Sequence, residues 1–319
     1  MQKSILCIGE LLIDFICSDI SVGLYEGSTF IKKAGGAPAN VGAAISKLGG
    51  KAIFAGKVGK DPFGDFLGKT LLNAGVDISL LVKDEKVNTT LAFVALQENG
   101  ERDFIFNRGA DELLEYQELS EEIIRKCEIM HFGSATALLG GPLKETYLQV
   151  MELANKLNVF IAFDPNFRED LWRGNEAEFI DRSKRCFRYV DFVKVSDTEM
   201  RIISGQESLQ QGLMIFHGLG AKIVAVTLGA EGTLISNGQN AEMVPSIKIK
   251  PVDSTGAGDA FVGAVLYQIA KLENPQVLVD DFTKIKCITA FANKVGAIVC
   301  TKMGAISALP FLEEVNRCG

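Results

Sequence analysis

Short, continuous apolar runs alternate with amphipathic stretches along most of the chain. The runs are rich in β-branched and aromatic residues, are bounded by Gly, Pro or Asp, and read SILCIGE, AIFAGKVG, IMHFGSA, VFIAFDP, FVKVSD and KIVAVTLG. Helix-like patterns such as FGDFLGKTLLNAG and PLKETYLQVMELANKLN lie between them. Strands that are apolar on both sides are typical of a parallel sheet covered by helices. The sequence therefore predicts an α/β fold, with a mostly parallel sheet and helices on both faces.

Two segments depart from this pattern, residues 15–33 and residues 88–108, because apolar and polar residues alternate in them without an intervening helix. The second segment carries a hairpin signal, Glu98-Asn99-Gly100-Glu101, between two alternating arms. We therefore expect a small antiparallel β flap that serves as a lid. No Pro- or Ser-rich linker is present, so residues 1–319 are predicted to form a single domain that includes this lid.

Charge and cysteine content exclude several classes of protein. The net charge of the 319 residues is −7 and there is no basic stripe, which argues against a nucleic-acid partner. No run approaches the roughly 18 apolar residues that a membrane-spanning helix requires, and Glu10 and Asp14 interrupt the N-terminal run, which predicts a strand and not a secretory signal. The seven cysteines are scattered without a C-x-x-C pair, so neither a disulfide framework nor a zinc site is expected. A reducing cytoplasm fits these features.

Polar residues follow several of the predicted strands. In a parallel α/β sheet, ligands bind beyond the carboxyl ends of the strands. The sequence places Asp14, Asp164, Ser196 and Thr227 at such ends. His131 lies inside an apolar run and is expected in the core.

The segment PVDSTGAGDAFVG, residues 251–263, combines a glycine-rich turn with the start of an apolar helix. Glycines there leave backbone N–H groups open to an anion, and the helix dipole adds partial positive charge. Asp259 falls in the first turn, where a carboxylate is held ionised beside that anion site. This arrangement suits phosphoryl transfer, which needs a base for the alcohol proton and stabilisation of the phosphoryl charge. The alternative is that Asp259 only caps a structural helix.

A second glycine pair occurs in AGGAPANVGAAISKLGG, residues 34–50. Gly35 and Gly36 can bring backbone N–H groups close to a ligand, and the Asn40 amide can both donate and accept. These features suit a polyhydroxylated substrate. The segment lacks the Lys-Ser/Thr ending of a P-loop. Taken alone, it is also compatible with a structural Gly-Gly turn.

These two segments resemble the signatures of the ribokinase-like (PfkB) carbohydrate kinases. The resemblance extends over almost the whole chain, because GELLIDF, AGKVGKDPFG, FDPNFREDLW, VKVSDTE, TLGAEG and TKMGAISALP occur in that family's order and spacing. The forms GGAPANV, DPNFR…LW and VKVSDTE are most similar to those of fructokinases. The resemblance implies ATP-dependent phosphorylation of a sugar hydroxymethyl group, with Mg²⁺ as cofactor.

The resemblance also implies roles for individual residues. Asp259 matches the catalytic base, and Gly256, Ala257 and Gly258 match the anion hole for the transferred phosphoryl group. Asp14, taken as the end of the first strand, matches an acid that binds sugar hydroxyls together with Gly36 and Asn40. The positions that match the nucleotide site are Ser196, Thr227, Gly229, Gly232 and Asn293.

Metal binding is implied at two places. The family's N-x-x-E motif corresponds to Ser196-Asp197-Thr198-Glu199, so Glu199 is expected to act on Mg²⁺ through water, because this ion tends to retain its hydration shell. A potassium ion is implied near the anion hole, where the matching positions are Asp253, Thr255, Val299, Lys302 and Gly304.

Two arginines and the flap aromatics bear on the choice of sugar. Arg108 and Arg168 are either structural or substrate-binding, and in 2-keto-3-deoxygluconate kinases arginines at such places meet a carboxylate. The flap carries Phe93, Phe104 and Phe106, whose side chains cannot hydrogen-bond. They favour an apolar lid that covers the sugar, which indicates neutral fructose as the substrate.

The leading hypothesis is therefore a fructokinase. The alternatives are a kinase for 2-keto-3-deoxygluconate or another ketose, and a non-catalytic nucleotide- or sugar-binding protein. A binding protein has no need of Asp259, and a nicotinamide dehydrogenase is excluded because Ile8-Gly9-Glu10 is not a G-x-G-x-x-G turn. An isolated strand pair is only marginally stable, so we also expect a homodimer formed through the lid.

Overall fold

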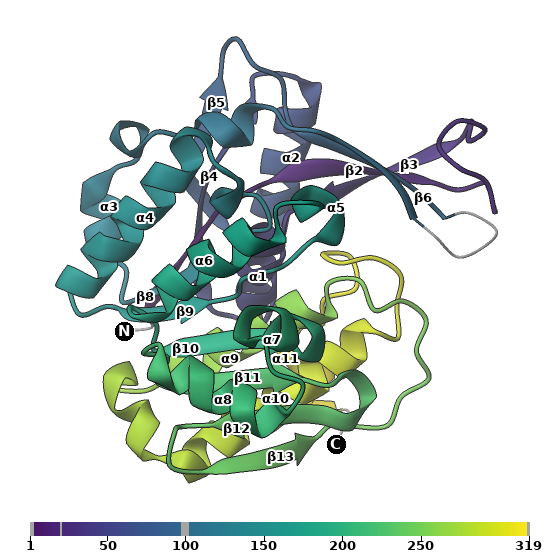
Figure 1. Ribbon diagram of the computed structural model, residues 1–319. Helices are drawn as coiled ribbons and strands as arrows, with labels where there is room; N and C mark the ends of the chain where they lie inside the picture. Colours follow the sequence, from purple (N-terminus) through teal and green to yellow (C-terminus); the bar gives the residue numbers. More distant parts are fainter. Residues whose placement is uncertain (1–2, 20, 97–101, 318–319) are drawn as a thin grey trace.

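The computed structural model describes residues 3–19, 21–96 and 102–317 (Figure 1). Its main sheet has, in spatial order, β13 (Ala241–Pro245), β12 (Gly232–Ser236), β11 (Ile223–Thr227), β10 (Phe192–Ser196), β9 (Phe160–Phe163), β8 (Ile129–Phe132), β1 (Ser4–Ile8), β4 (Lys51–Gly59) and β5 (Asp77–Asp84). Neighbouring strands from β5 to β11 pair in parallel, whereas β12 and β13 add an antiparallel edge. The predicted, mostly parallel sheet is confirmed.

Helices cover both faces of this sheet. One face carries α1 (Ala37–Lys47), α2 (Pro62–Asn73), α9 (Ala257–Ile269), α10 (Phe282–Val299) and α11 (Leu312–Arg317). The other carries α3 (Glu121–Arg125), α4 (Gly141–Lys156), α5 (Glu169–Trp172), α6 (Glu176–Phe187), α7 (Asp197–Ser204) and α8 (Leu209–Gly218). Short 3₁₀ helices link several elements: η1 (Ala110–Leu113), η2 (Tyr116–Glu118), η3 (Ala137–Leu139), η4 (Gly229–Glu231) and η5 (Pro275–Asp280).

The strand residues alternate between the two cores, as the pleat of a sheet requires. In β1, Ile5 and Cys7 belong to the first core, and Leu6 and Ile8 belong to the second. All four side chains are fully buried. This double-sided burial is the physical reason why the strands are continuous apolar runs.

A second, smaller sheet projects from one side of the body (Figure 1). We call it the lid; its strands, in spatial order, are β3 (Phe30–Gly35), β2 (Leu12–Cys17), β6 (Leu91–Leu96) and β7 (Arg102–Asn107). The predicted small sheet is confirmed, but it is mixed and not wholly antiparallel. Each of β2–β3 and β6–β7 is antiparallel, and β2 and β6 pair in parallel because both run outward from the body. The predicted turn at residues 98–101 lies outside the described residues.

The strand register decides which lid side chains share a face. Asp14 is in register with Ala92, which pairs with Phe106, so Phe106 lies on the Asp14 face, as does Phe104 two residues earlier in β7. Phe93 pairs with Phe15 on the opposite face and stacks on it, with ring centroids 5.1 Å apart. Phe93 therefore does not share a face with Phe104 and Phe106.

Among the described residues, none of the helices combines the length and the apolar character that crossing a bilayer demands.

Candidate active site

The lid strand β2 carries Asp14, which faces Lys33 across the β2–β3 pair. The prediction that Asp14 ends the first strand is wrong. β1 ends at Ile8, and the chain turns at Gly9, whose φ is +148°, before β2 begins. A Cβ on Gly9 would lie 2.7 Å from the Ser134 Cβ, so a side chain at this turn would clash.

Neighbouring atoms lie so close to Gly35 and Gly36 that no side chain fits at either position. A Cβ on Gly35 would lie 2.1 Å from Asp14 Oδ2. A Cβ on Gly36 would lie 2.4 Å from the Glu10 carbonyl oxygen, and the φ of Gly36 is +113°. The glycine pair therefore lets the end of β3 pass directly against the Asp14 carboxylate and the turn between β1 and β2.

Glu10 holds the start of α1 and was not recognised as a site residue from the sequence. Its Oε1 accepts a hydrogen bond from Ala37 N–H at 2.9 Å, and its Oε2 accepts one from the Ser134 hydroxyl at 2.5 Å. Burial raises the pKa of Glu10 to about 7. The sequence feature that could have identified Glu10 is its position as a carboxylate inside an apolar N-terminal run.

The first turns of α1 and α9 meet at the predicted base. Asn40 Nδ2 donates to Asp259 Oδ2 at 2.8 Å, and both side chains are buried. The two helices approach closely because Gly263 of α9 has no side chain; a Cβ there would lie 2.6 Å from the Ala44 Cβ. Asn40 Oδ1 is buried without a partner among the described residues. It is therefore a free acceptor beside Asp259.

The N-terminus of α9 presents unused N–H groups. Gly256 is its N-cap, in the left-handed region with φ +76°. Ala257 N–H donates to the Ser254 carbonyl at 3.2 Å, whereas the N–H groups of Gly258 and Asp259 have no acceptor within the described part of the chain. Such a terminus is suited to an anion.

Positive charges act on both Asp14 of the lid and Asp259 of α9. Burial raises the pKa of Asp14 to about 6, and the nearby Arg168 and Lys33 lower it in part. Burial also raises the pKa of Asp259, which the hydrogen bond from Asn40 and the charge of Arg168 counteract. Arg168 therefore acts on both carboxylates, although its side chain is exposed.

A buried ion pair lies beside the base. Lys194, on β10, contacts Asp164 Oδ2 through its Nζ at 3.2 Å, and both side chains are buried. A Cβ on Gly258 would lie 3.1 Å from this Nζ. Sequence reasoning missed Lys194, and the signal was a lysine inside the apolar run FVKVS.

Arg108 contacts neighbouring acids and a backbone carbonyl of the protein. Its Nη2 donates to the Thr136 carbonyl at 3.0 Å, and it lies 3.7 Å from carboxylate oxygens of both Asp111 and Glu112. Asp111 is itself buried. The guanidinium therefore has structural partners on the protein.

The predicted nucleotide residues lie along the edge formed by β10, β11 and β12. Thr227 ends β11, Gly229 (φ +57°) begins η4, and Gly232 (φ +112°) follows it. Asn293 is buried in α10; its Nδ2 donates to the Val244 carbonyl at 2.8 Å. Its Oδ1 accepts from the hydroxyl of Thr233, so this amide ties α10 to the sheet.

Both carboxylate oxygens of Glu199 accept hydrogen bonds from the protein. Its Oε2 accepts from Ser196 N–H at 2.7 Å, which closes a capping box at α7, and its Oε1 accepts from Phe167 N–H at 2.7 Å. No group of three or more His, Cys, Asp or Glu suited to a metal occurs among the described residues. A Mg²⁺ ion bound at this place would reach Glu199 through water, because both carboxylate oxygens already accept hydrogen bonds.

Asp253 joins the two loops to which the resemblance assigns potassium. Its Oδ1 accepts from the Thr255 hydroxyl at 2.6 Å, and its Oδ2 accepts from Gly304 N–H at 2.8 Å. The Val299 carbonyl accepts from Lys302 N–H at 3.1 Å. The Asp253 carboxylate and the Thr255 hydroxyl therefore lie together beside Gly304, and both are oxygen groups that suit a hard cation.

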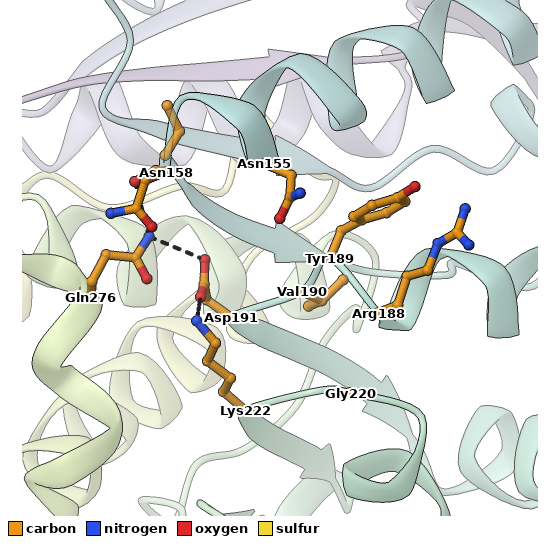
Figure 2. A pocket seen from close by; sticks show the side chains of 10 residues that line it. Asn155, Asn158, Arg188, Tyr189, Val190, Asp191, Gly220, Lys222 and Gln276 are labelled. Carbon is orange, nitrogen blue, oxygen red and sulfur yellow. Dashed lines mark hydrogen bonds and ion pairs between the residues drawn. The ribbon is translucent and has the colours of Figure 1, made fainter.

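A separate polar hollow lies at the amino ends of β9, β10 and β11, the opposite edge of the sheet (Figure 2). Its central Asp191 pairs with Lys222 at 2.6 Å and lies 3.5 Å from Gln276 Nε2. None of the predicted site residues lines this hollow.

Comparison with known proteins identifies the family. The model of the "pfkB family carbohydrate kinase" matches residues 2–312. Fructokinase-1 of Zea mays is 41% identical over 317 residues, which cover 98% of this chain and 97% of that protein.

Two solved structures are similar over almost their full lengths. The fructokinase from Xylella fastidiosa with bound ATP has a TM-score of 0.90 and 33% identity, covering 99% of this chain and 98% of that one. A double mutant of the fructokinase from Vibrio cholerae O395, with fructose, ADP and potassium ion bound, has a TM-score of 0.87 and 30% identity, covering 99% of both chains. The chain therefore belongs to the pfkB family of carbohydrate kinases.

Proposed function

We propose that this protein is a fructokinase, which transfers the γ-phosphoryl group of ATP to the 6-hydroxyl of D-fructose and gives fructose 6-phosphate and ADP. The observation that carries the proposal is the junction of α1 and α9, where the Asp259 carboxylate is buried against Asn40 beside unused N–H groups. Full-length similarity to fructokinases, one of them solved with fructose bound, supports it.

In this proposal the site divides into a sugar side and a phosphate side. Asp14, the Gly35–Gly36 turn and the free Asn40 Oδ1 bind sugar hydroxyls, and Phe104 and Phe106 cover the apolar face of the sugar. Asp259 accepts the proton of the attacking hydroxyl. The Gly256-Ala257-Gly258 turn binds the transferred phosphoryl group through backbone N–H groups, which stabilise its charge in the transition state.

The nucleotide is proposed to lie between β10–β12 and α10, in contact with Ser196, Thr227, Gly229 and Gly232. Asn293 is proposed to stabilise this site by joining α10 to Thr233 of β12. Mg²⁺, when bound, neutralises phosphate charge, and Glu199 is the residue that would hold it through water. Potassium would be held by Asp253, Thr255 and the carbonyl groups of Val299, Lys302 and Gly304. The cytoplasm remains the expected location.

The charges favour a neutral sugar over the keto-acid. Arg108 is already matched by Asp111 and Glu112. Arg168 is shared by Asp14 and Asp259, so neither arginine is a surplus cation for a substrate carboxylate. A bound 2-keto-3-deoxygluconate would place a third anion beside two acids.

We expect kcat/KM for fructose to exceed that for 2-keto-3-deoxygluconate by at least about tenfold, which corresponds to about 1.4 kcal/mol. A coupled ADP-release assay with both substrates measures this. In Arg168→Ala, a preference for fructose should persist. A preference for the keto-acid in the wild type, lost only in this variant, would identify the protein as a 2-keto-3-deoxygluconate kinase.

The lid also carries our proposal of a homodimer. Tyr25, in the loop between β2 and β3, is 98% exposed, and the lid residues Ile31 and Ile105 are about half exposed. By the strand register Ile31 lies on the Asp14 face of the lid and Ile105 on the opposite face, and the apolar area around Ile31 is what a second copy of the lid can cover.

Light scattering after size exclusion is expected to give twice the mass of the chain. Ile31→Asp should shift the protein toward the single-chain mass, because it places a charge in the covered surface. Met214→Asp is the matched control, since Met214 is exposed on α8 in the main body. Equal behaviour of the two variants would exclude the lid as the interface.

A further inference from the structure

Lys194 is a buried cation placed where the proposed reaction develops negative charge. The Nζ reaches the first turn of α9, because Gly258 has no side chain and a Cβ there would lie only 3.1 Å away. Asp164 fixes the ammonium on the other side, at 3.2 Å. The glycine at position 258 therefore has a second purpose beyond its backbone N–H group: it admits a lysine.

A buried lysine is costly unless it serves a purpose that an apolar residue cannot. Lys194 is 8% exposed and lies on the sheet face that carries Phe192 and the apolar core under α9. Replacing such a pair with apolar residues is often neutral or stabilising, so stability alone gives little reason for it.

The charges around the base show what the lysine does. Four groups face Asp259: Asn40 from α1, Asp164 after β9, Arg168 before α5 and Lys194 from β10. Burial raises the pKa of Asp259 and Asp164 raises it further, whereas Lys194 and Arg168 lower it. Because Arg168 is exposed, Lys194 is the buried cation among these four groups.

Two further groups face the lysine itself. Glu199 of α7 is a nearby carboxylate and, with Asp164 and Asp259, offsets the effect of burial so that the pKa of Lys194 is raised. His131 of β8 is fully buried with both ring nitrogens unpartnered in the described structure, and burial together with the Lys194 charge lowers its pKa to about 3. His131 is therefore neutral, and the lysine keeps its charge.

We propose that Lys194 is a positioning residue for phosphoryl transfer: held by Asp164 against Gly258, its ammonium keeps Asp259 as a carboxylate ready to accept the sugar proton. This inference rests on the proposed function, because it assigns Asp259 as the base. It adds a residue that acts through Asp259.

The test is the acidic limb of the kcat–pH profile, since kcat reports groups in the enzyme–substrate complex. Lys194→Met removes a positive charge beside Asp259, so the limb should move to higher pH by about one unit or more. Asp164→Asn removes a negative charge, so the limb should move to lower pH. The double variant Asp164→Asn/Lys194→Met should lie between the two.

The same variants also control for a loss of folding. Lys194→Met leaves Asp164 buried and unpaired, whereas the double variant removes both charges, so at least one informative variant is expected to fold. Lys222→Met is the matched control: it breaks the Asp191–Lys222 pair at the opposite edge of the same sheet (Figure 2) and should leave the limb unchanged. Equal loss of kcat at every pH, with no movement of the limb, would make Lys194 purely structural and overturn the inference.

A second measurement does not depend on turnover. Titration of the ¹³Cγ signals of aspartate-labelled protein gives the pKa of Asp259 directly, with Asp259→Asn identifying the signal. The same order is expected: highest in Lys194→Met and lowest in Asp164→Asn. A wild type that does not phosphorylate fructose would refute the proposed function alone. A pKa of Asp259 that is the same in the wild type and in Lys194→Met would refute this inference alone.

Discussion

Asp259→Asn is expected to lower kcat by about 10²–10⁴-fold while ATP binding is largely kept. The amide cannot accept the proton of the sugar hydroxyl, yet it has nearly the same shape, so it can still accept the hydrogen bond that Asn40 Nδ2 donates at 2.8 Å. The N–H groups at the start of α9 are backbone groups and remain in place. Steady-state kinetics with fructose, together with calorimetric titration of ATP, separate turnover from binding.

Asp181→Asn provides the control for this experiment. Asp181 lies on α6, is exposed and pairs with Arg185, so the same change of charge there should leave kcat unaltered. If Asp259→Asn keeps more than a tenth of the wild-type turnover, another group takes the proton and the assignment of the base is wrong.

Asp14→Asn is expected to lower kcat/KM for fructose by about 10- to 150-fold, which matches the 1.5–3 kcal/mol of a hydrogen bond to a charged group. The pH dependence follows from burial, which raises the pKa of Asp14 to about 6. The carboxylate binds sugar hydroxyls above that pH and is protonated below it. Wild-type kcat/KM should therefore fall as the pH drops through about 6, and the contribution of this group should vanish in the variant.

Gly35→Ala tests the same contact without changing the acid. Its added Cβ would lie 2.1 Å from Asp14 Oδ2, so the carboxylate must move and KM for fructose should rise. Gly218→Ala is the control, because a Cβ there has no neighbour within 4 Å. A wild-type KM retained in both Asp14→Asn and Gly35→Ala would remove Asp14 from the sugar site.

The part of the fold that depends on local pattern could be predicted from the sequence. Continuous apolar runs correspond to strands buried on both faces, and polar residues after them, such as Asp164 and Ser196, do lie at the carboxyl ends. The lid strands were also predicted, because alternation indicates burial on one side.

What could not be predicted depends on register and on contacts distant in sequence. The strand that carries Asp14 could not be predicted, because the turn at Gly9 packs against Ser134, which is distant in sequence. The face occupied by Phe93 depends on the β2–β6 pairing, which no local pattern specifies. Lys194 lies inside an apolar run, and its partner Asp164 is 30 residues away, so no local pattern predicts their ion pair.

The hydrogen bond between Asn40 and Asp259 joins residues 219 positions apart. Closing so long a loop costs entropy before any contact repays it, so the two helix ends meet only when most of the sheet between them is in place. On the ribosome, a nascent chain can form the lid and the first strands long before it has a base. Catalytic competence thus arrives with the last third of the chain, and a translation product that stops before Asp259 lacks the proposed base.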